Sequence, residues 1–217
     1  VRVHHEKGDR LMIWLGDFVV NNRRKLLPGM TLLVVFLIAF LPRNELNDVF
    51  LEYFDETIPF RNATDFTVNN LTGMYLIDFS IESAEPGGIS EPGFLQEVED
   101  FANWFRQQPE TIHVNVFTDI MKRLNKNMHG DDNTMYRLPD ERNLAAQYLL
   151  MYEMSLPYGL DLNNQINVDK SATRMVVTLQ TLSTNQMIEL EQRSNQWIAD
   201  NAKYIKAAAA SGPTMMF

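Results

Sequence analysis

The longest apolar run of the sequence covers residues 26–42 (LLPGMTLLVVFLIAFLP) and contains no charged side chain. Pro28 and Gly29 fall in its first turn, where a missing backbone N–H costs little, and Thr31 can return its hydroxyl to the helix backbone. A helix of about 20 apolar residues, with about 17 as the lower limit, can cross the hydrocarbon core of a bilayer. The pattern predicts a transmembrane helix over residues 26–43. A buried helix of a soluble protein is the alternative.

A strand-helix-strand pattern begins after residue 73. Residues 74–82 alternate between apolar and polar side chains, which is typical of a strand with one buried face. A Gly- and Pro-rich connection follows, with Ser90 as the expected N-cap of a helix. The apolar positions that follow at helical spacing are Phe94, Val98, Phe101 and Phe105. Residues 112–116 then alternate again as a second strand.

The same order returns about 100 residues later. Residues 172–182 are rich in β-branched side chains and predict a strand, and Ser183 caps a helix with a second apolar stripe. Residues 203–217 close the chain as a final strand, and two helices over residues 119–128 and 140–155 join the two patterns. The sequence thus predicts an α+β fold in which one transmembrane helix precedes two β-α-β units, at about 73–118 and 172–217, each a sheet with helices on one face.

The charge distribution predicts an orientation for the expected membrane helix. Residues 1–25 carry six Lys and Arg against three Asp and Glu, whereas residues 43–217 carry thirteen against twenty-five. Basic residues next to a membrane helix stay on the cytoplasmic side. We therefore expect a cytoplasmic segment over residues 1–25 and an extracytoplasmic domain over residues 44–217. The acidic outer part argues against nucleic acid as a partner, because phosphate binding needs a basic surface.

Catalytic and metal-binding arrangements are not indicated by the sequence. The chain has no Cys, and its spacing assembles no nucleophile, base and acid around His113 or His129. His4 and His5 are adjacent, so on a helix they would not face one another. Asp131-Asp132 could hold a cation, but a solvated turn is the simpler interpretation. We expect no enzyme activity, no catalytic residue, no metal and no cofactor.

Several segments, taken in order, resemble the resistance-nodulation-division (RND) exporters, and most closely the hydrophobe/amphiphile branch of predicted exporters. They are a basic segment, one apolar helix, LNDVFLEYFDE at residues 46–56, a β-α-β unit, RLPDERNLAAQYLLMYEM at residues 137–154 and a second β-α-β unit. The resemblance covers nearly all of residues 10–217. It implies ferredoxin-like porter subdomains in the periplasm, beside the bacterial inner membrane. It also implies partners, namely the lipid bilayer, the rest of a transporter and further copies of the chain.

The resemblance predicts a function in the export of hydrophobic or amphiphilic, lipid-like compounds. Exporters of this kind use buried membrane carboxylates, and residues 26–42 contain none, so the chain would supply only the porter region. Ligand sites favour domain boundaries that are lined by apolar side chains, so we expect a cleft between the two β-α-β units. The expected walls of the substrate path come from the segment that joins the two units: Tyr148, Met151, Tyr152 and Met154. The alternative function is that of a single-span extracytoplasmic sensor or protein-interaction domain.

Overall fold

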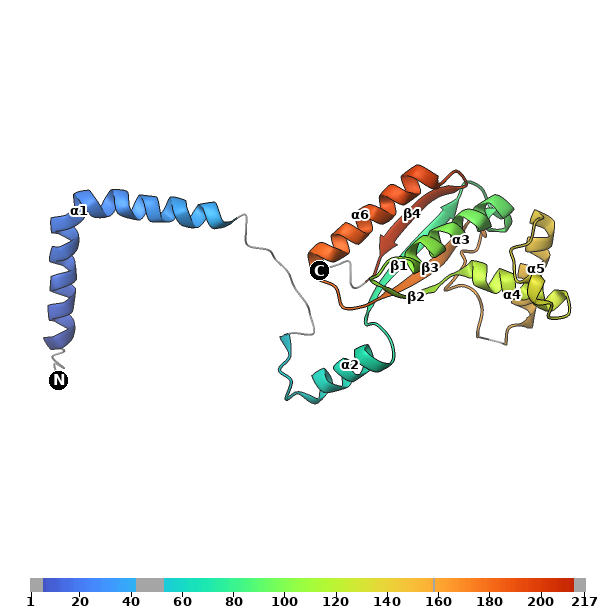
Figure 1. Ribbon diagram of the computed structural model, residues 1–217, viewed down its shortest axis with the longest axis horizontal. Coiled ribbons are helices and arrows are strands. Elements are labelled where there is room, and N and C mark those ends of the chain that lie inside the picture. The colour runs from blue at the N-terminus through green and yellow to red at the C-terminus, as the bar shows by residue number, and fades with distance from the viewer. Residues whose placement is uncertain (1–5, 42–52, 158, 213–217) are drawn as a thin grey trace. The chain divides into compact units, whose positions relative to one another are not determined.

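The computed structural model describes residues 6–41, 53–157 and 159–212, and the chain divides into two compact units, Val1–Leu46 and Asn47–Phe217. Figure 1 shows the elements of both units along the chain. Several sequence predictions lie outside the described residues. They are the His4-His5 pair, most of the acidic segment at residues 46–56, the end of the expected span and the last five positions of the expected final strand.

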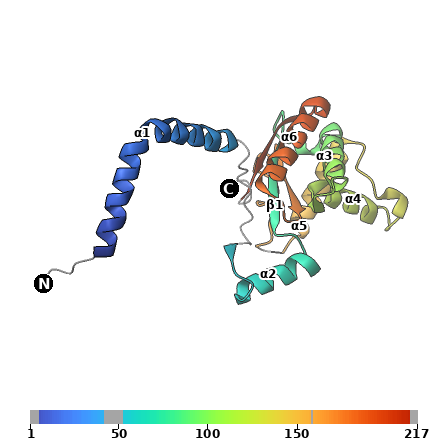
Figure 2. The ribbon, with the colours of Figure 1, turned by 60° about the vertical axis from the view of Figure 1, so that its left-hand side comes forward.

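The described residues of the first unit form the helix α1 (Glu6–Phe40), which has a bend near its middle (Figures 1 and 2). Pro28 lies inside α1, where it removes one hydrogen bond of the helix and its ring crowds the carbonyl of Arg24. Proline is the usual cause of such a bend. As expected, the Thr31 hydroxyl donates to the backbone carbonyl of Leu27 at 2.9 Å.

The predicted transmembrane helix over residues 26–43 is wrong. Among the helices of the described residues, none is both long and apolar enough to span a bilayer. The helix α1 ends at Phe40 and includes the Arg23-Arg24-Lys25 cluster, so its uncharged part is the fifteen positions from 26 to 40. That length gives about 22 Å at about 1.5 Å per residue, against a hydrocarbon core of about 30 Å. The expected location in a bacterial inner membrane, with residues after 44 in the periplasm, depended on this span. Because no helix of the described residues could cross the bilayer, that location is not supported.

The second unit contains one four-stranded antiparallel sheet. Its strands are β1 (Tyr75–Ser83), β2 (Thr111–Asn115), β3 (Ala172–Leu179) and β4 (Ile205–Ser211), in the order β2-β3-β1-β4 (Figure 1). Phe79 at the centre of β1 lies opposite Met175 of β3 on one side and Ala210 of β4 on the other. The strands that the alternating pattern predicts are thus confirmed in position.

The prediction of two ferredoxin-like porter units, each with its own layers, is also wrong. Both strand-helix-strand segments are present, but their strands interleave, because β1 pairs with β3 and β4, and β3 pairs with β1 and β2. The described residues therefore contain a single sheet and a single core. Within this part of the chain there is therefore no boundary between two such units, where the substrate path was expected.

Two helices cover one face of this sheet. They are α3 (Pro92–Arg106) and α6 (Thr184–Asn201), and they lie side by side (Figures 1 and 2). The predicted cap of α6 is confirmed, since Ser183 and Gln186 form a reciprocal capping box. The predicted cap of α3 is wrong. Ser90 is buried in the short helix η3 (Gly88–Ser90), and Glu91 holds the N-cap position.

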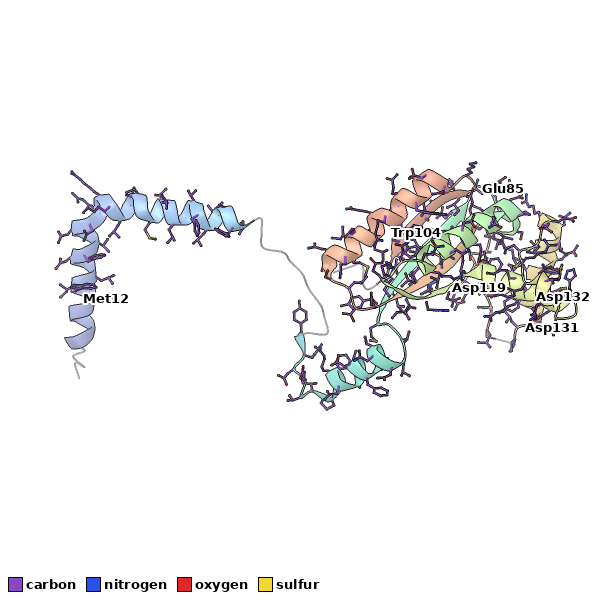
Figure 3. All side chains as sticks on the ribbon, viewed as in Figure 1. Met12, Glu85, Trp104, Asp119, Asp131 and Asp132 are labelled. Atoms are coloured by element: carbon purple, nitrogen blue, oxygen red, sulfur yellow. The ribbon has the colours of Figure 1, made fainter. Side chains whose placement is uncertain are left out.

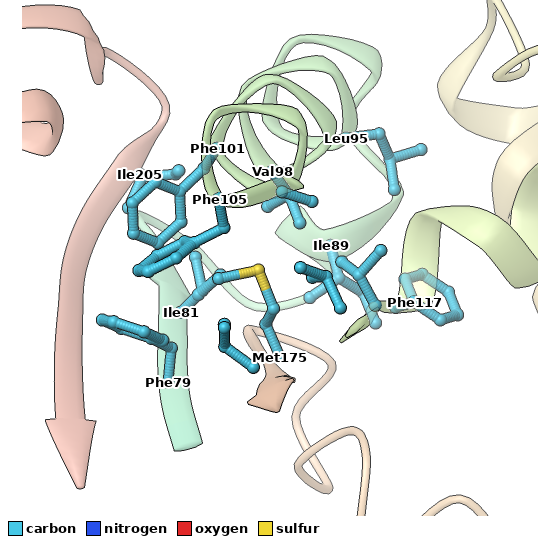
Figure 4. Packing of buried hydrophobic residues seen from close by; sticks show 14 of the residues in the cluster. Phe79, Ile81, Ile89, Leu95, Val98, Phe101, Phe105, Phe117, Met175 and Ile205 are labelled. Atoms are coloured by element: carbon cyan, nitrogen blue, oxygen red, sulfur yellow. The ribbon is translucent and has the colours of Figure 1, made fainter. Parts of the chain in front are cut away.

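Aromatic rings fill the space between these helices and the sheet (Figure 4). Phe101 of α3 is fully buried, and its ring lies 5.3 Å from that of Phe79 and 5.1 Å from that of Trp197 of α6. Phe105, one turn further along α3, also packs on Phe79. The apolar stripe that the sequence assigns to α3 therefore does face the core.

Glu97, on the solvent side of α3, fixes the start of β4. Its carboxylate oxygens accept backbone N–H groups from Lys203, Tyr204 and Ile205 at 2.8, 2.8 and 3.0 Å. A hydrogen bond to an ionised acceptor is stronger than one between neutral groups. Gly93 permits the Tyr204 ring to lie close to the backbone of α3, because a Cβ atom at Gly93 would lie 2.5 Å from that ring.

The remaining elements lie beside these two layers. They are α2 (Pro59–Asn70), α4 (Phe117–Met128), the short helix η4 (Asn133–Met135) and α5 (Arg142–Ser155). Of these, α4 and α5 add Phe117, Met121 and Leu149 to the same buried core. The helices α4 and α5 pack against each other beyond the β2 side of the sheet (Figure 1). The segment that follows α5 returns to the sheet, where Arg174 of β3 donates its backbone N–H to the carbonyl of Gln165.

Candidate functional site

A buried amide holds α4 and α5 together. Asn125 of α4 is 2% exposed, and its side-chain nitrogen donates to the backbone carbonyls of Met135 and Arg137 at 3.1 and 3.0 Å. Its side-chain oxygen accepts the Tyr148 hydroxyl of α5 at 3.2 Å. Buried polar groups of this kind need all their partners, so Asn125 fixes α5 and the η4 loop relative to α4.

A cleft of about 640 Å³ opens beside this pair of helices, between α4, the C-terminal end of α5 and the loop that follows it. We call it the α4–α5 cleft. Its lining residues are Ile120, Tyr152, Leu156, Gly159, Leu160, Asp161, Leu162, Asn163, Asn164 and Gln165.

The lining of the α4–α5 cleft combines apolar and polar residues. The apolar or aromatic ones are Ile120 of α4, Tyr152 of α5, and Leu156, Leu160 and Leu162 of the chain beyond α5. The polar ones, Asp161, Asn163, Asn164 and Gln165, come from the same loop as Leu160 and Leu162. Small-molecule sites in proteins combine these two features, a mostly apolar wall with a few polar groups that orient the ligand.

Backbone hydrogen bonds fix the loop at residues 159–165, which lines the cleft. The N–H groups of Gln165 and Ile166 both donate to the carbonyl of Leu162 at 2.8 Å. Ile166 is buried in the core, and Thr173 of β3 donates its hydroxyl to the Gln165 carbonyl at 3.2 Å. The loop is therefore attached to a central strand of the sheet.

The structure brings only one of the four predicted substrate-path residues to this cleft. Tyr152 lines it. Tyr148 is buried and bonded to Asn125, so its role is structural. Met151 and Met154 are 47% and 78% exposed and are not among the lining residues.

The sequence analysis missed most of the lining residues, because they come from α4 and from the loop after Pro157. The sequence pattern predicts only a short helix around Ile120, and it predicts no helix or strand over residues 159–165. One signal was available. Leu160 and Leu162 stand out in a polar loop that has no helical or strand period of its own, which indicates contact with something other than a regular element.

A cluster of charged side chains joins α3 to α4. Lys122 lies 2.7 Å from Glu99 and 2.8 Å from Asp119, and Arg106 lies 2.7 Å from Asp119. Glu99 is buried and also accepts the hydroxyl of Thr118. Burial by itself lowers the pKa of the Lys122 ammonium, but hydrogen bonds to Asp119 and Glu99 outweigh it, so that this pKa lies above its ordinary value. These charges neutralise one another, and the cluster acts as a link between helices.

The Asp131-Asp132 pair lies in a tight turn after α4 (Figure 3). The Asp132 carboxylate accepts the backbone N–H of Thr134 at 2.9 Å, and this bond holds the pKa of Asp132 below its ordinary value. Among the residues that the structure describes, no three His, Cys, Asp or Glu side chains are grouped so that they could hold a metal ion.

No protein-family model matches this chain, and no curated protein matches it either. The resemblance to RND exporters therefore stays a prediction from the sequence.

Proposed function

We propose that the second unit binds a hydrophobic or amphiphilic small molecule in the α4–α5 cleft. The observation that carries this proposal is the cleft itself, with its volume of about 640 Å³ and its mixed lining of apolar and polar residues. Ligand sites have volumes of about 300–1,000 Å³ and combine apolar residues with a few polar groups. An amphiphile would place its hydrocarbon chain against Ile120, Leu156 and Leu160, and its head group against the loop at residues 161–165.

The sequence resemblance suggests what such binding would serve. We propose on that ground that the chain is part of an RND-type exporter of lipid-like compounds, and that the second unit binds the compound. The partners would then be the rest of the transporter and its hydrophobic cargo. The α4–α5 cleft supports the binding step of this proposal, and the export step rests on the resemblance alone.

One observation favours a second function, the binding of a protein partner. Leu150, Met151 and Met154 are exposed on α5 at positions that share one helix face, outside the cleft. Methionine side chains adapt to different partners and are common at such surfaces. The sequence leaves this alternative open as a protein-interaction domain. The membrane span that was part of that alternative is not present among the described helices.

A titration with an uncharged amphiphile tests the binding proposal. Isothermal calorimetry of the full chain with dodecyl maltoside, kept below its micelle concentration, should show saturable binding. Leu160→Asp should weaken that binding about tenfold or more, because an ionised carboxylate would have to be buried against the hydrocarbon chain. Leu160 is exposed when the cleft is empty, so the variant should keep its circular dichroism spectrum and thermal midpoint.

Leu150→Asp is the matched control, because it places the same charge on an exposed leucine of α5 that lies outside the cleft. Its affinity should equal that of the unchanged chain. Weaker binding by Leu150→Asp alone would move the site to the exposed face of α5 and favour the second function. Absence of binding by the unchanged chain would overturn the proposal.

A further inference from the structure

The polar residues that line the α4–α5 cleft are one carboxylate and three carboxamides. They are Asp161, Asn163, Asn164 and Gln165. Of the described residues that line the cleft, Asp161 is the single carboxylate, and none is Lys, Arg or His. An anionic head group in the cleft would therefore lose its hydration without meeting a cation.

Asp161 keeps acceptor capacity for a ligand. Its carboxylate accepts the side-chain amide of Asn163 at 2.6 Å, which orients both groups within the loop. It also accepts the backbone N–H of Asn163 at 3.4 Å. A carboxylate offers about four lone-pair sites, so these two bonds leave room for others. Within the described part of the chain, no basic side chain forms an ion pair with Asp161. The basic residue nearest to it in sequence, Lys170, pairs with Glu153 at 2.7 Å.

The charge of the whole chain acts in the same direction. Its formal net charge is −9 at pH 7, and residues 43–217 carry twelve more acidic than basic side chains. A net negative domain attracts cations and repels anions at ranges up to the Debye length, about 10 Å at 0.1 M salt. Both the lining of the cleft and the net negative charge of the chain select against fatty-acid-like anions.

We infer that the α4–α5 cleft takes amphiphiles with a cationic head group, and that Asp161 is the residue that selects them. The inference rests on the proposed function, since it names the class of amphiphile that the same cleft binds. The apolar wall contacts the hydrocarbon chain of any amphiphile. The head group decides between a trimethylammonium or amine, which Asp161 attracts, and a carboxylate, which it repels.

Three amphiphiles with the same twelve-carbon chain test this inference on the full chain: dodecyltrimethylammonium, dodecyl maltoside and laurate. At low salt, dodecyltrimethylammonium should bind about fivefold tighter than dodecyl maltoside, and laurate should bind weakest, as expected for one partly exposed ion pair. Asp161→Asn should abolish the difference in affinity between the cation and the neutral compound, because the variant keeps the size and polarity of the side chain and removes its charge. Added salt should reduce the preference, because the pair is near solvent.

Asp200→Asn is the control for net charge, because it removes one carboxylate from α6 at a position that does not line the cleft. It should keep the preference for the cation. Equal affinities for the three compounds, a preference for laurate, or a cation preference that survives Asp161→Asn would each overturn the inference while the proposed function stands. Absence of binding by dodecyl maltoside and by both ionic compounds would overturn the proposed function itself.

Discussion

Phe101→Ala should lower the free energy of unfolding of the second unit by about 3–5 kcal/mol, the range seen when a buried aromatic side chain is truncated. Phe101 is fully buried and contacts four other rings, those of Phe79, Trp104, Phe105 and Trp197. Alanine would leave a cavity between α3, α6 and β1 that these rings cannot fill without leaving their packed positions. Urea unfolding followed by tryptophan fluorescence measures the loss, because two of the neighbouring rings are tryptophans.

Asn103→Ala provides the control on the same helix. Its side chain bonds to Arg106 at the surface, at 2.8 Å, and contributes nothing to the core. The loss should stay within about 0.5 kcal/mol, as for most surface substitutions. Similar losses for the two variants would mean that the apolar stripe of α3 does not face the sheet.

Asn125→Ala should cost about 2–4 kcal/mol, because it leaves three buried or half-buried groups without their partner. These groups are the carbonyls of Met135 and Arg137 and the hydroxyl of Tyr148. Tyr148→Phe removes only the last of the three bonds and should cost about 1 kcal/mol. Chemical denaturation of both variants measures the two values. Equal losses would show that the two carbonyl bonds contribute nothing, and that α4 and α5 are held by apolar packing instead.

The strands and the core helices could be predicted because each is a local pattern. The alternation around Phe79 and the helical spacing of Phe101 and Phe105 require one buried face, whatever that face packs against. The cap at Ser183 is equally local, since its partner Gln186 is three residues away. A pattern confined to about ten residues is sufficient for all of these features.

The pairing of the strands could not be predicted in the same way. Alternation of apolar and polar residues indicates which side chains face the core, but it does not indicate which strands are neighbours in the sheet. Two successive strand-helix-strand patterns are therefore compatible with two sheets or with one interleaved sheet. The observed sheet places β1 between β3 and β4 through partners such as Met175 and Ala210, which lie about 100 residues or more from Phe79.

The prediction of the membrane helix was wrong because the apolar run at residues 26–42 is close to the lower length for a span, and the helix that contains it ends at Phe40. The substrate path stays a prediction. It was placed on α5 because that segment joins the two expected units and carries aromatic and methionine side chains. Tyr148 is buried by a long-range bond to Asn125, and the cleft is completed by a loop that carries no periodic signal.

The most direct test of the account is the location of a bound amphiphile on the chain. An uncharged dodecyl maltoside analogue with a diazirine at the end of its alkyl chain would be photolysed with the full protein, and the adducts would be mapped by mass spectrometry. We predict adducts on Leu156, on residues 159–165 and on Ile120 of α4, and their loss in the presence of excess dodecyl maltoside or in Leu160→Asp. Adducts confined to α1 or to the sheet, or adducts that excess ligand does not displace, would contradict the proposal that the α4–α5 cleft is the binding site.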